Sequence, residues 1–163
     1  MLREIVSYAK QVAQAVGIHY GAAHVELKAQ RKEDTLHYED PVMMEVGARL
    51  SGGRKATMTQ AAVDDWDPFT ALIQSHCGYE YPGTTTNNWT PTKFVRHVFL
   101  PIKQSGLVRD VQLDTTRLRT LHSSALMIKI GDIVAETTDI TSCACFVWLV
   151  GERSLVDEDT AYL

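Results

Sequence analysis

Residues 21–53 read GAAHVELKAQRKEDTLHYEDPVMMEVGARLSGG, and they contain the two strand-like segments that decide the fold. From residue 23 to residue 29, apolar and polar residues alternate, which is typical of a strand with one polar face. A second short strand-like run, residues 42–46, follows Pro41. Charged and polar residues fill positions 30–40 between the two runs. We therefore expect the two strands to pair antiparallel through a loop of about eleven residues.

Each predicted strand carries one glutamate on its polar face, Glu26 on the first and Glu45 on the second. Directly opposed side chains in an antiparallel pair have Cβ atoms about 4.5–5.5 Å apart, where two carboxylates repel unless a cation or a proton lies between them. Mg²⁺ fits this position best, because it prefers oxygen ligands and is often held by only one or two carboxylates. Arg49, four residues after Glu45, could then present its planar guanidinium to a phosphate oxygen or a substrate carboxylate.

A second interpretation of the same three residues is purely structural. Glu26 and Glu45 would then be solvated side chains on an exposed sheet face, and Arg49 would be their ion partner at the surface. The spacing of the three residues is the same in both cases, so it leaves both interpretations open.

The segments around this hairpin have mainly helical patterns. Apolar residues recur at helical spacing over residues 2–16, and a glycine follows as a C-terminal stop. Two adjacent glycines predict a turn at residues 51–54, because glycine permits positive φ and weakens regular elements. Two further helices are expected, at residues 56–63 and 67–77, and the second begins with an Asp-Pro pair that suits a helix start.

The second half of the chain is rich in residues that favour β-strands. Residues 79–92 are rich in Gly, Pro, Thr and Asn, and they predict a surface connection between two parts, 1–80 and 81–163. Beyond it we expect strands at residues 94–102, 107–113, 125–130 and 144–150, a short helix at 115–121 and a terminal helix at 154–163. The predicted class is α+β, with a mostly antiparallel sheet that carries the glutamate hairpin, helices against one face and a β-rich C-terminal extension.

The composition argues against several classes of protein. The 163 residues include 16 basic and 20 acidic side chains, mixed along the chain, so no block of like charge could hold a nucleic-acid backbone. No apolar run approaches the roughly 20 residues that span a bilayer, and the N-terminus lacks the order of a signal peptide. We therefore expect a soluble, cytoplasmic protein with neither a nucleic-acid nor a membrane partner. The three cysteines are expected to be reduced thiols, because their number is odd and their spacing fits no zinc site.

The order of these motifs resembles the signature of the ATP-grasp family. In that family a strand running from glycine to His-x-Glu precedes a strand with Glu-x-x-x-Arg-x-x-Gly, and residues 21–26 and 45–52 show both patterns. The helix that ends at residues 16–18 and the helix start at residues 64–68 also follow the family's order. The likeness covers residues 2 to about 78 well and the remaining β-rich segment only loosely. It implies the C-terminal half of an ATP-grasp catalytic domain, followed by a β-rich C-terminal subdomain.

The resemblance implies an ATP- and Mg²⁺-dependent ligase that joins a carboxylate to an amine through an acylphosphate, with ADP and phosphate released. On that likeness Glu26 and Glu45 bind the Mg²⁺ ions that bridge the ATP phosphates. Arg49 is then the catalytic residue that stabilises charge on the acylphosphate. A Glu-x-Gly/Ala-x-Arg form occurs in the branch that resembles amino-acid and dipeptide ligases, which favours an amino acid as the carboxylate.

The same likeness implies supporting roles for two neighbouring features. The turn formed by Ser51, Gly52 and Gly53 would admit an ATP phosphate or substrate backbone at close range, and a plain structural turn is the alternative. His24 shares a strand face with Glu26 and would orient that carboxylate. An ordinary polar strand residue is the alternative for His24.

The chain departs from the family's pattern in two respects. Many ATP-grasp members have asparagine two residues after the second glutamate, where this chain has Gly47, so the coordination of a second metal ion stays open. The strand lysines, glycine-rich lid and hinge that hold the nucleotide would precede Met1, so we expect a missing N-terminal segment or a partner chain to supply them. The alternatives are a truncated, non-catalytic fragment or pseudoenzyme, and a member like biotin carboxylase or the purine-pathway enzymes.

Overall fold

The structure is a computed structural model, and it describes residues 2–31, 38–64, 66–79 and 91–163. The chain divides into two compact units: unit 1 comprises residues 1–57 and 66–88, and unit 2 comprises residues 58–65 and 89–163. The predicted boundary between residues 80 and 81 lies outside the described residues and stays a prediction. None of the helices in the described ranges is both long and apolar enough to cross a membrane.

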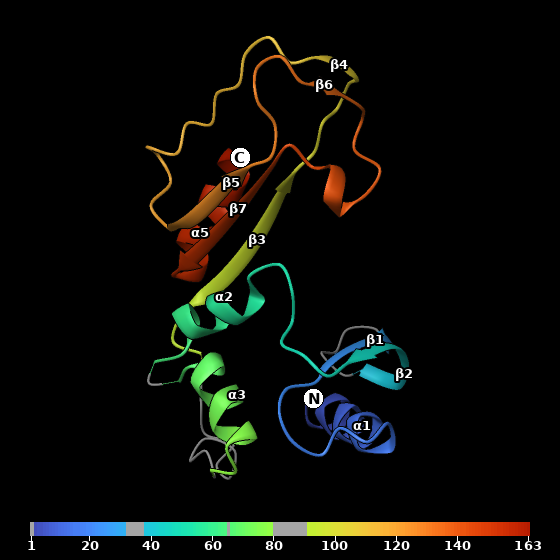
Figure 1. The fold of residues 1–163 in the computed structure, drawn as a ribbon. Coiled ribbons are helices and arrows are strands. Elements are labelled where there is room, and N and C mark those ends of the chain that lie inside the picture. The colour runs from blue at the N-terminus through green and yellow to red at the C-terminus, as the bar shows by residue number, and fades with distance from the viewer. Residues whose placement is uncertain (1, 32–37, 65, 80–90) are drawn as a thin grey trace. The chain divides into compact units, whose positions relative to one another are not determined.

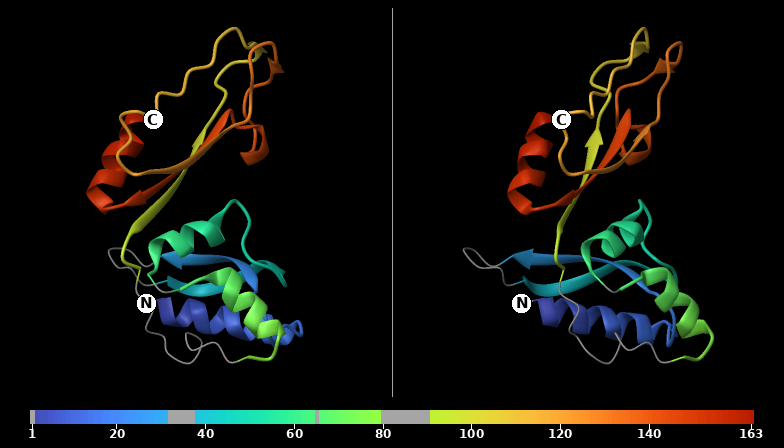
Figure 2. Two further views of the ribbon diagram at one scale, coloured as in Figure 1. Left: turned by 60° about the vertical axis from the view of Figure 1, so that its left-hand side comes forward. Right: turned by 90° about the vertical axis from the view of Figure 1, so that its left-hand side faces the viewer.

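Unit 1 contains the predicted hairpin, packed against the N-terminal helix (Figure 2). Helix α1 (Leu2–Ala15) contacts both β1 (His24–Arg31) and β2 (Tyr38–Gly47), and the two strands pair antiparallel. These elements confirm the predicted helix and the predicted strand pair. The predicted loop over residues 30–40 was too long, because both strands continue into it, and residues 32–37 lie outside the described part of the chain.

The two helices that follow the hairpin along the chain also match the prediction. Helix α2 is Lys55–Ala62 and helix α3 is Pro68–His76. The Asp67 carboxylate caps α3, because it accepts hydrogen bonds from the backbone N–H groups of Phe69 (3.0 Å) and Thr70 (3.2 Å). The hydrogen bond from the Thr70 hydroxyl, with these two backbone bonds, lowers the pKa of the Asp67 carboxyl despite some desolvation.

Unit 2 is built on a three-stranded antiparallel sheet with one helix along it (Figure 1). The strand order is β3-β7-β5, and α5 contacts β3 and β7. A separate two-stranded sheet pairs β4 with β6. The bounds are β3 (Phe94–Leu100), β4 (Gly106–Leu107), β5 (Leu121–Leu126), β6 (Ile133–Val134), a 3₁₀ turn (Ile140–Ser142), β7 (Cys145–Gly151) and α5 (Arg153–Tyr162). Val147, Leu149 and Val156 are fully buried and form the centre of the core.

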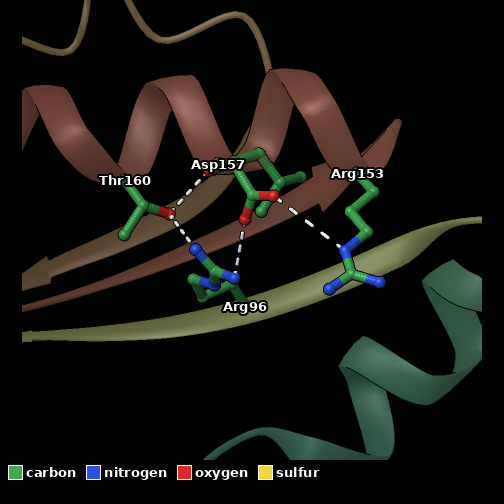
Figure 3. A network of polar contacts seen from close by, with 5 residues as sticks. Arg96, Arg153, Asp157 and Thr160 are labelled. Atoms are coloured by element: carbon green, nitrogen blue, oxygen red, sulfur yellow. Dashed lines mark hydrogen bonds and ion pairs between the residues drawn. The ribbon is translucent and has the colours of Figure 1, made fainter.

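Polar side chains of β3 and α5 form a network of ion pairs and hydrogen bonds where the helix packs on the sheet (Figure 3). The Arg96 guanidinium on β3 lies 2.7 Å from the Asp157 carboxylate and donates to the Thr160 hydroxyl at 3.2 Å. Arg153 forms a longer ion pair with Asp157, at 3.9 Å. The guanidinium carbons of Arg96 and Arg153 both lie about 5.5 Å from the centre of the Phe94 ring, within cation–π range.

The α+β class is confirmed, and the antiparallel pairing with it. The described strands form three sheets, and the glutamate hairpin is a two-stranded sheet of its own. In place of the predicted strand at 107–113 the structure has only the two residues of β4. The strand predicted at 125–130 begins earlier in the chain, as β5, and residues 115–121 do not form the predicted helix. The prediction missed β6 and the 3₁₀ turn.

Local hydrogen bonds explain why residues 108–120 adopt neither of the predicted elements. The Asp110 carboxylate accepts from the backbone N–H of Val111 at 2.8 Å, and the Asp114 carboxylate accepts from the N–H of Thr116 at 3.0 Å. Such bonds compete with helix and sheet hydrogen bonds and favour turns. Leu118 still reaches the core of unit 2, so the segment is held by burial rather than by regular structure.

Candidate functional site

The two predicted glutamates lie directly opposite one another in unit 1. Glu26 of β1 and Glu45 of β2 are register partners in the antiparallel pair, so their side chains leave the same face of the hairpin. The side chains are 53% and 62% exposed, which leaves their oxygens open to solvent and to a ligand. The opposed placement expected from the sequence is therefore confirmed.

A β-bulge adjoins the glutamate pair. Leu27, the residue after Glu26, pairs with Met43 rather than Met44, so Met44 is an extra residue in β2. The backbone N–H of Met43 donates to the hydroxyl of Tyr8 on α1, at 3.1 Å. The bulge therefore keeps Glu45 on the same face as Glu26 while α1 satisfies a backbone donor beside it. Residues 42–44 are all apolar, so the sequence pattern does not show which of them is the extra residue.

Arg49 folds back toward the second glutamate. Its Nη2 lies 3.8 Å from the Glu45 Oε1, and its Nη1 donates to the backbone carbonyl of Leu50 at 3.2 Å. A Cβ atom at Gly47 would lie 3.4 Å from Nε of Arg49, which is an ordinary van der Waals contact. Space around Arg49 therefore does not require glycine at this position.

His24 lies beside the first glutamate, on the same strand face. Its Nε2 is 3.8 Å from the Glu26 Oε1, and its side chain is only 15% exposed. Its Nδ1 is buried and has no hydrogen-bond partner among the described residues. The structure thus places His24 beside Glu26, and its role in orienting that carboxylate stays a prediction.

The turn after Arg49 has the conformation that its glycines predict. Gly53 has φ of +66° and Arg54 has φ of +59°, and the N–H of Lys55 donates to the Gly52 carbonyl at 3.3 Å. A Cβ added at Gly52 would meet nothing within 4 Å, so open space surrounds that position. The Ser51 hydroxyl oxygen is buried and lacks a hydrogen-bond partner in the described part of the chain. The turn is confirmed, and its proposed contact with phosphate stays a prediction.

The loop before β1 forms a hydrogen bond and a ring contact with helix α3 within unit 1. The N–H of Gly21 donates to the Ser75 hydroxyl at 2.7 Å, and the Tyr20 ring meets the His76 ring edge-on at 5.5 Å. Gly21 has φ of +82°, and an added Cβ would lie 3.0 Å from Nε2 of His76. Glycine is therefore required here for both conformation and space.

Replacing Gly21 with alanine is expected to destabilise unit 1 by about 1–2 kcal/mol, the usual cost of a side chain in the left-handed region. The measurement is urea denaturation followed by circular dichroism. The matched control is Gly52→Ala, which adds its methyl group to open space. Equal stability of the two variants would contradict the close contact with His76.

The donor set at this face fits Mg²⁺. Two opposed carboxylates supply anionic oxygen ligands, and Mg²⁺ usually takes one or two carboxylates and completes its octahedron with water and phosphate oxygens. Among the residues that the structure describes, no group of three or more His, Cys, Asp or Glu side chains is arranged around one metal position. Glu26 and Glu45 could therefore hold the ion as a pair, with the remaining ligands coming from phosphate and water.

Comparison with solved structures finds a ligase of similar fold. The crystal structure of L-amino acid ligase from Bacillus licheniformis matches with a TM-score of 0.76 and 17% sequence identity, over 98% of this chain and 38% of the ligase chain. This chain thus spans well under half of that ligase. A scan of protein-family models gives no match, and a search of curated proteins gives none either. At 17% identity the likeness shows a shared fold.

Proposed function

We propose that this chain forms part of an ATP- and Mg²⁺-dependent ATP-grasp ligase that joins an amino-acid carboxylate to an amine. One observation carries the proposal: Glu26 and Glu45 oppose each other on one face, with the Arg49 guanidinium 3.8 Å from the Glu45 carboxylate. The fold shared with an L-amino acid ligase supports the reaction class. ATP and amino acids are both abundant in the cytoplasm, and we place the protein there.

The proposed reaction has two transfers. An oxygen of the substrate carboxylate attacks the terminal phosphorus of ATP, forming an acylphosphate and releasing ADP. The amine nitrogen then attacks the acyl carbon, loses a proton and displaces phosphate, which leaves an amide. Bound Mg²⁺ would supply positive charge to the phosphate oxygens.

The residues of this chain then have distinct tasks in the reaction. Glu26 and Glu45 hold the metal, and His24 limits the orientations of Glu26 through its contact at 3.8 Å. Arg49 carries a permanent charge in a planar fork, which suits the spread negative charge of a phosphoryl group. The turn at residues 51–53 lets phosphate or substrate backbone approach closely.

The partial coverage of the ligase favours a second candidate function. The chain corresponds to 38% of that protein, and the rest of the ligase has no counterpart in these 163 residues. On this alternative the chain contributes metal ligands and an arginine to a site whose nucleotide-binding part is supplied by a further segment or a partner chain. A non-catalytic fragment of a ligase fold is the limiting case.

Divalent-metal binding tests the carboxylate pair directly. Mn²⁺ serves as a paramagnetic probe for Mg²⁺, and its free-ion electron paramagnetic resonance signal falls as it binds the purified chain. We expect Glu26→Gln and Glu45→Gln each to weaken binding at least about tenfold, because each removes one of two anionic ligands. The matched control, Glu136→Gln, changes an exposed glutamate of unit 2 and should bind Mn²⁺ as the natural chain does. Unchanged binding in both test variants would refute the metal site.

Nucleotide binding separates the two candidate functions. Calorimetry with MgATP and measurement of ADP release with mixed amino acids would be made on the purified chain. ADP release that requires an amino acid supports a complete ligase. Mn²⁺ binding without MgATP binding supports the alternative in which another segment supplies the nucleotide site.

A further inference from the structure

Unit 2 contains a hollow of about 670 Å³ at one end of its three-stranded sheet. Strands β3 and β5 begin at this end and β7 finishes there, so three chain segments that are distant in sequence meet around it. The first turn of α5 closes another side. The lining residues belong entirely to unit 2, and none of them is part of the glutamate site.

The lining of this hollow combines two kinds of side chain. Half-buried apolar side chains come from the ends of β5 and β7 and from α5: Leu121, Val150 and Leu155. Exposed polar side chains, here called the rim, include Lys93 before β3 and Glu152 after β7, and a second positive residue, Arg119, lines the hollow as well. The hollow therefore offers apolar surface beside charged groups of both signs.

The two rim charges are available to a ligand. Among the described residues, neither Lys93 nor Glu152 forms a salt bridge or a side-chain hydrogen bond, and Glu152 makes no side-chain cap on α5. Arg119, which also lines the hollow, is instead held by Glu158 of α5. The lining of one hollow thus includes an ammonium and a carboxylate that have no partner among the described residues.

We propose that this hollow binds a zwitterionic amino acid with an apolar side chain. The ligand carboxylate would pair with Lys93, its ammonium with Glu152, and its side chain would cover Leu121, Val150 and Leu155. A zwitterion complements two opposite charges at once, whereas a simple anion would be repelled by Glu152 and a simple cation by Lys93. His122, also on the rim, adds a further hydrogen-bonding group.

The site goes beyond the proposed ligase function and does not depend on it. Glu26→Gln with Glu45→Gln in one chain should abolish Mn²⁺ binding and leave amino-acid binding in unit 2 unchanged. Conversely, loss of the hollow's ligand should leave Mn²⁺ binding unchanged. The two proposals therefore fail separately.

Two-dimensional amide NMR of the purified chain, titrated with L-leucine, tests the site. We expect shifts concentrated at residues 92–93, 119–122 and 150–155, and at least about tenfold weaker binding in Lys93→Gln and in Glu152→Gln, since each removes one charge pair. The exposed-residue controls Lys103→Gln and Glu136→Gln should bind as the natural chain does. The dispersion of the same spectra shows whether each variant is folded.

Three further compounds test whether binding needs both charges of leucine. N-acetyl-leucine lacks the ammonium, leucinamide lacks the carboxylate, and inorganic phosphate is an anion alone. All three should bind at least about tenfold more weakly than leucine, because each meets one unmatched rim charge. Equal binding of any of them, an absence of shifts around the hollow, or undiminished binding in both rim variants would overturn the proposal.

Discussion

Replacing Arg49 with alanine is expected to slow the MgATP-dependent joining of an amino acid to an amine by about 100- to 1,000-fold. Arg49 follows the end of β2 at Gly47, and its half-exposed side chain lies next to the carboxylate proposed to bind Mg²⁺. There it would stabilise negative charge that develops on the transferred phosphoryl group, and a preorganised donor of this kind is typically worth that factor. The measurement is the rate of amino-acid-dependent ADP release at saturating MgATP.

The controls for Arg49 separate catalysis from folding. Arg49→Lys keeps the charge and loses the planar fork, so it should recover only part of the rate. Arg109→Ala removes an exposed arginine of unit 2 and should leave the rate unchanged. Mn²⁺ binding should not weaken in Arg49→Ala, because the change removes a positive charge beside Glu45. A normal rate in Arg49→Ala would exclude the catalytic role.

Replacing Asp159 with alanine is expected to destabilise unit 2 by about 3 kcal/mol. Asp159 on α5 is only 3% exposed, and its carboxylate accepts from the backbone N–H of Thr120 at 2.7 Å and from the Thr120 hydroxyl at 2.6 Å. Alanine would leave both buried donors without an acceptor, and each such donor costs about 1–3 kcal/mol. Urea denaturation monitored by tryptophan fluorescence measures the loss.

The contribution of Asp159 should also depend on pH. Burial raises the pKa of its carboxyl, but the hydrogen bonds from Thr120 and Arg119 outweigh burial and set the pKa below the usual value. Because the folded pKa is lowered, the stabilisation is complete above the unfolded pKa of about 3.9 and is lost as the pH falls through the folded pKa.

The isosteric variant Asp159→Asn tests this pH dependence. The stability difference between the natural chain and Asp159→Asn should be largest near pH 7 and should shrink below about pH 4. The control Asp64→Asn changes an exposed aspartate and should be as stable as the natural chain at pH 7. A difference that stays constant from pH 7 to pH 3 would contradict the assigned hydrogen bonds.

The sequence predicted correctly those features that depend on residues close together in the chain. The cap of α3 depends on Asp67 and the two amides that follow it closely, and the stop after α1 depends on Gly17, whose φ is +84°. The opposition of Glu26 and Glu45 was expected from the antiparallel pairing of the two strand-like runs, and the register of β1 with β2 confirms it. The wrong elements in residues 108–120 lie where aspartate side chains bond to nearby amides, which hydrophobic pattern alone does not reveal.

Local patterns along the chain were enough to predict the glutamate hairpin, the turn after Arg49 and the α+β class, because periodicity and turn residues act over a few positions. The contact of His24 with Glu26, and the position of Lys93 and Glu152 in the lining of one hollow, were visible only in the three-dimensional structure. Those contacts depend on bulges, on side-chain packing and on strand order. Each of these is set by the combined burial of residues that lie far apart in the chain, so no local pattern encodes it.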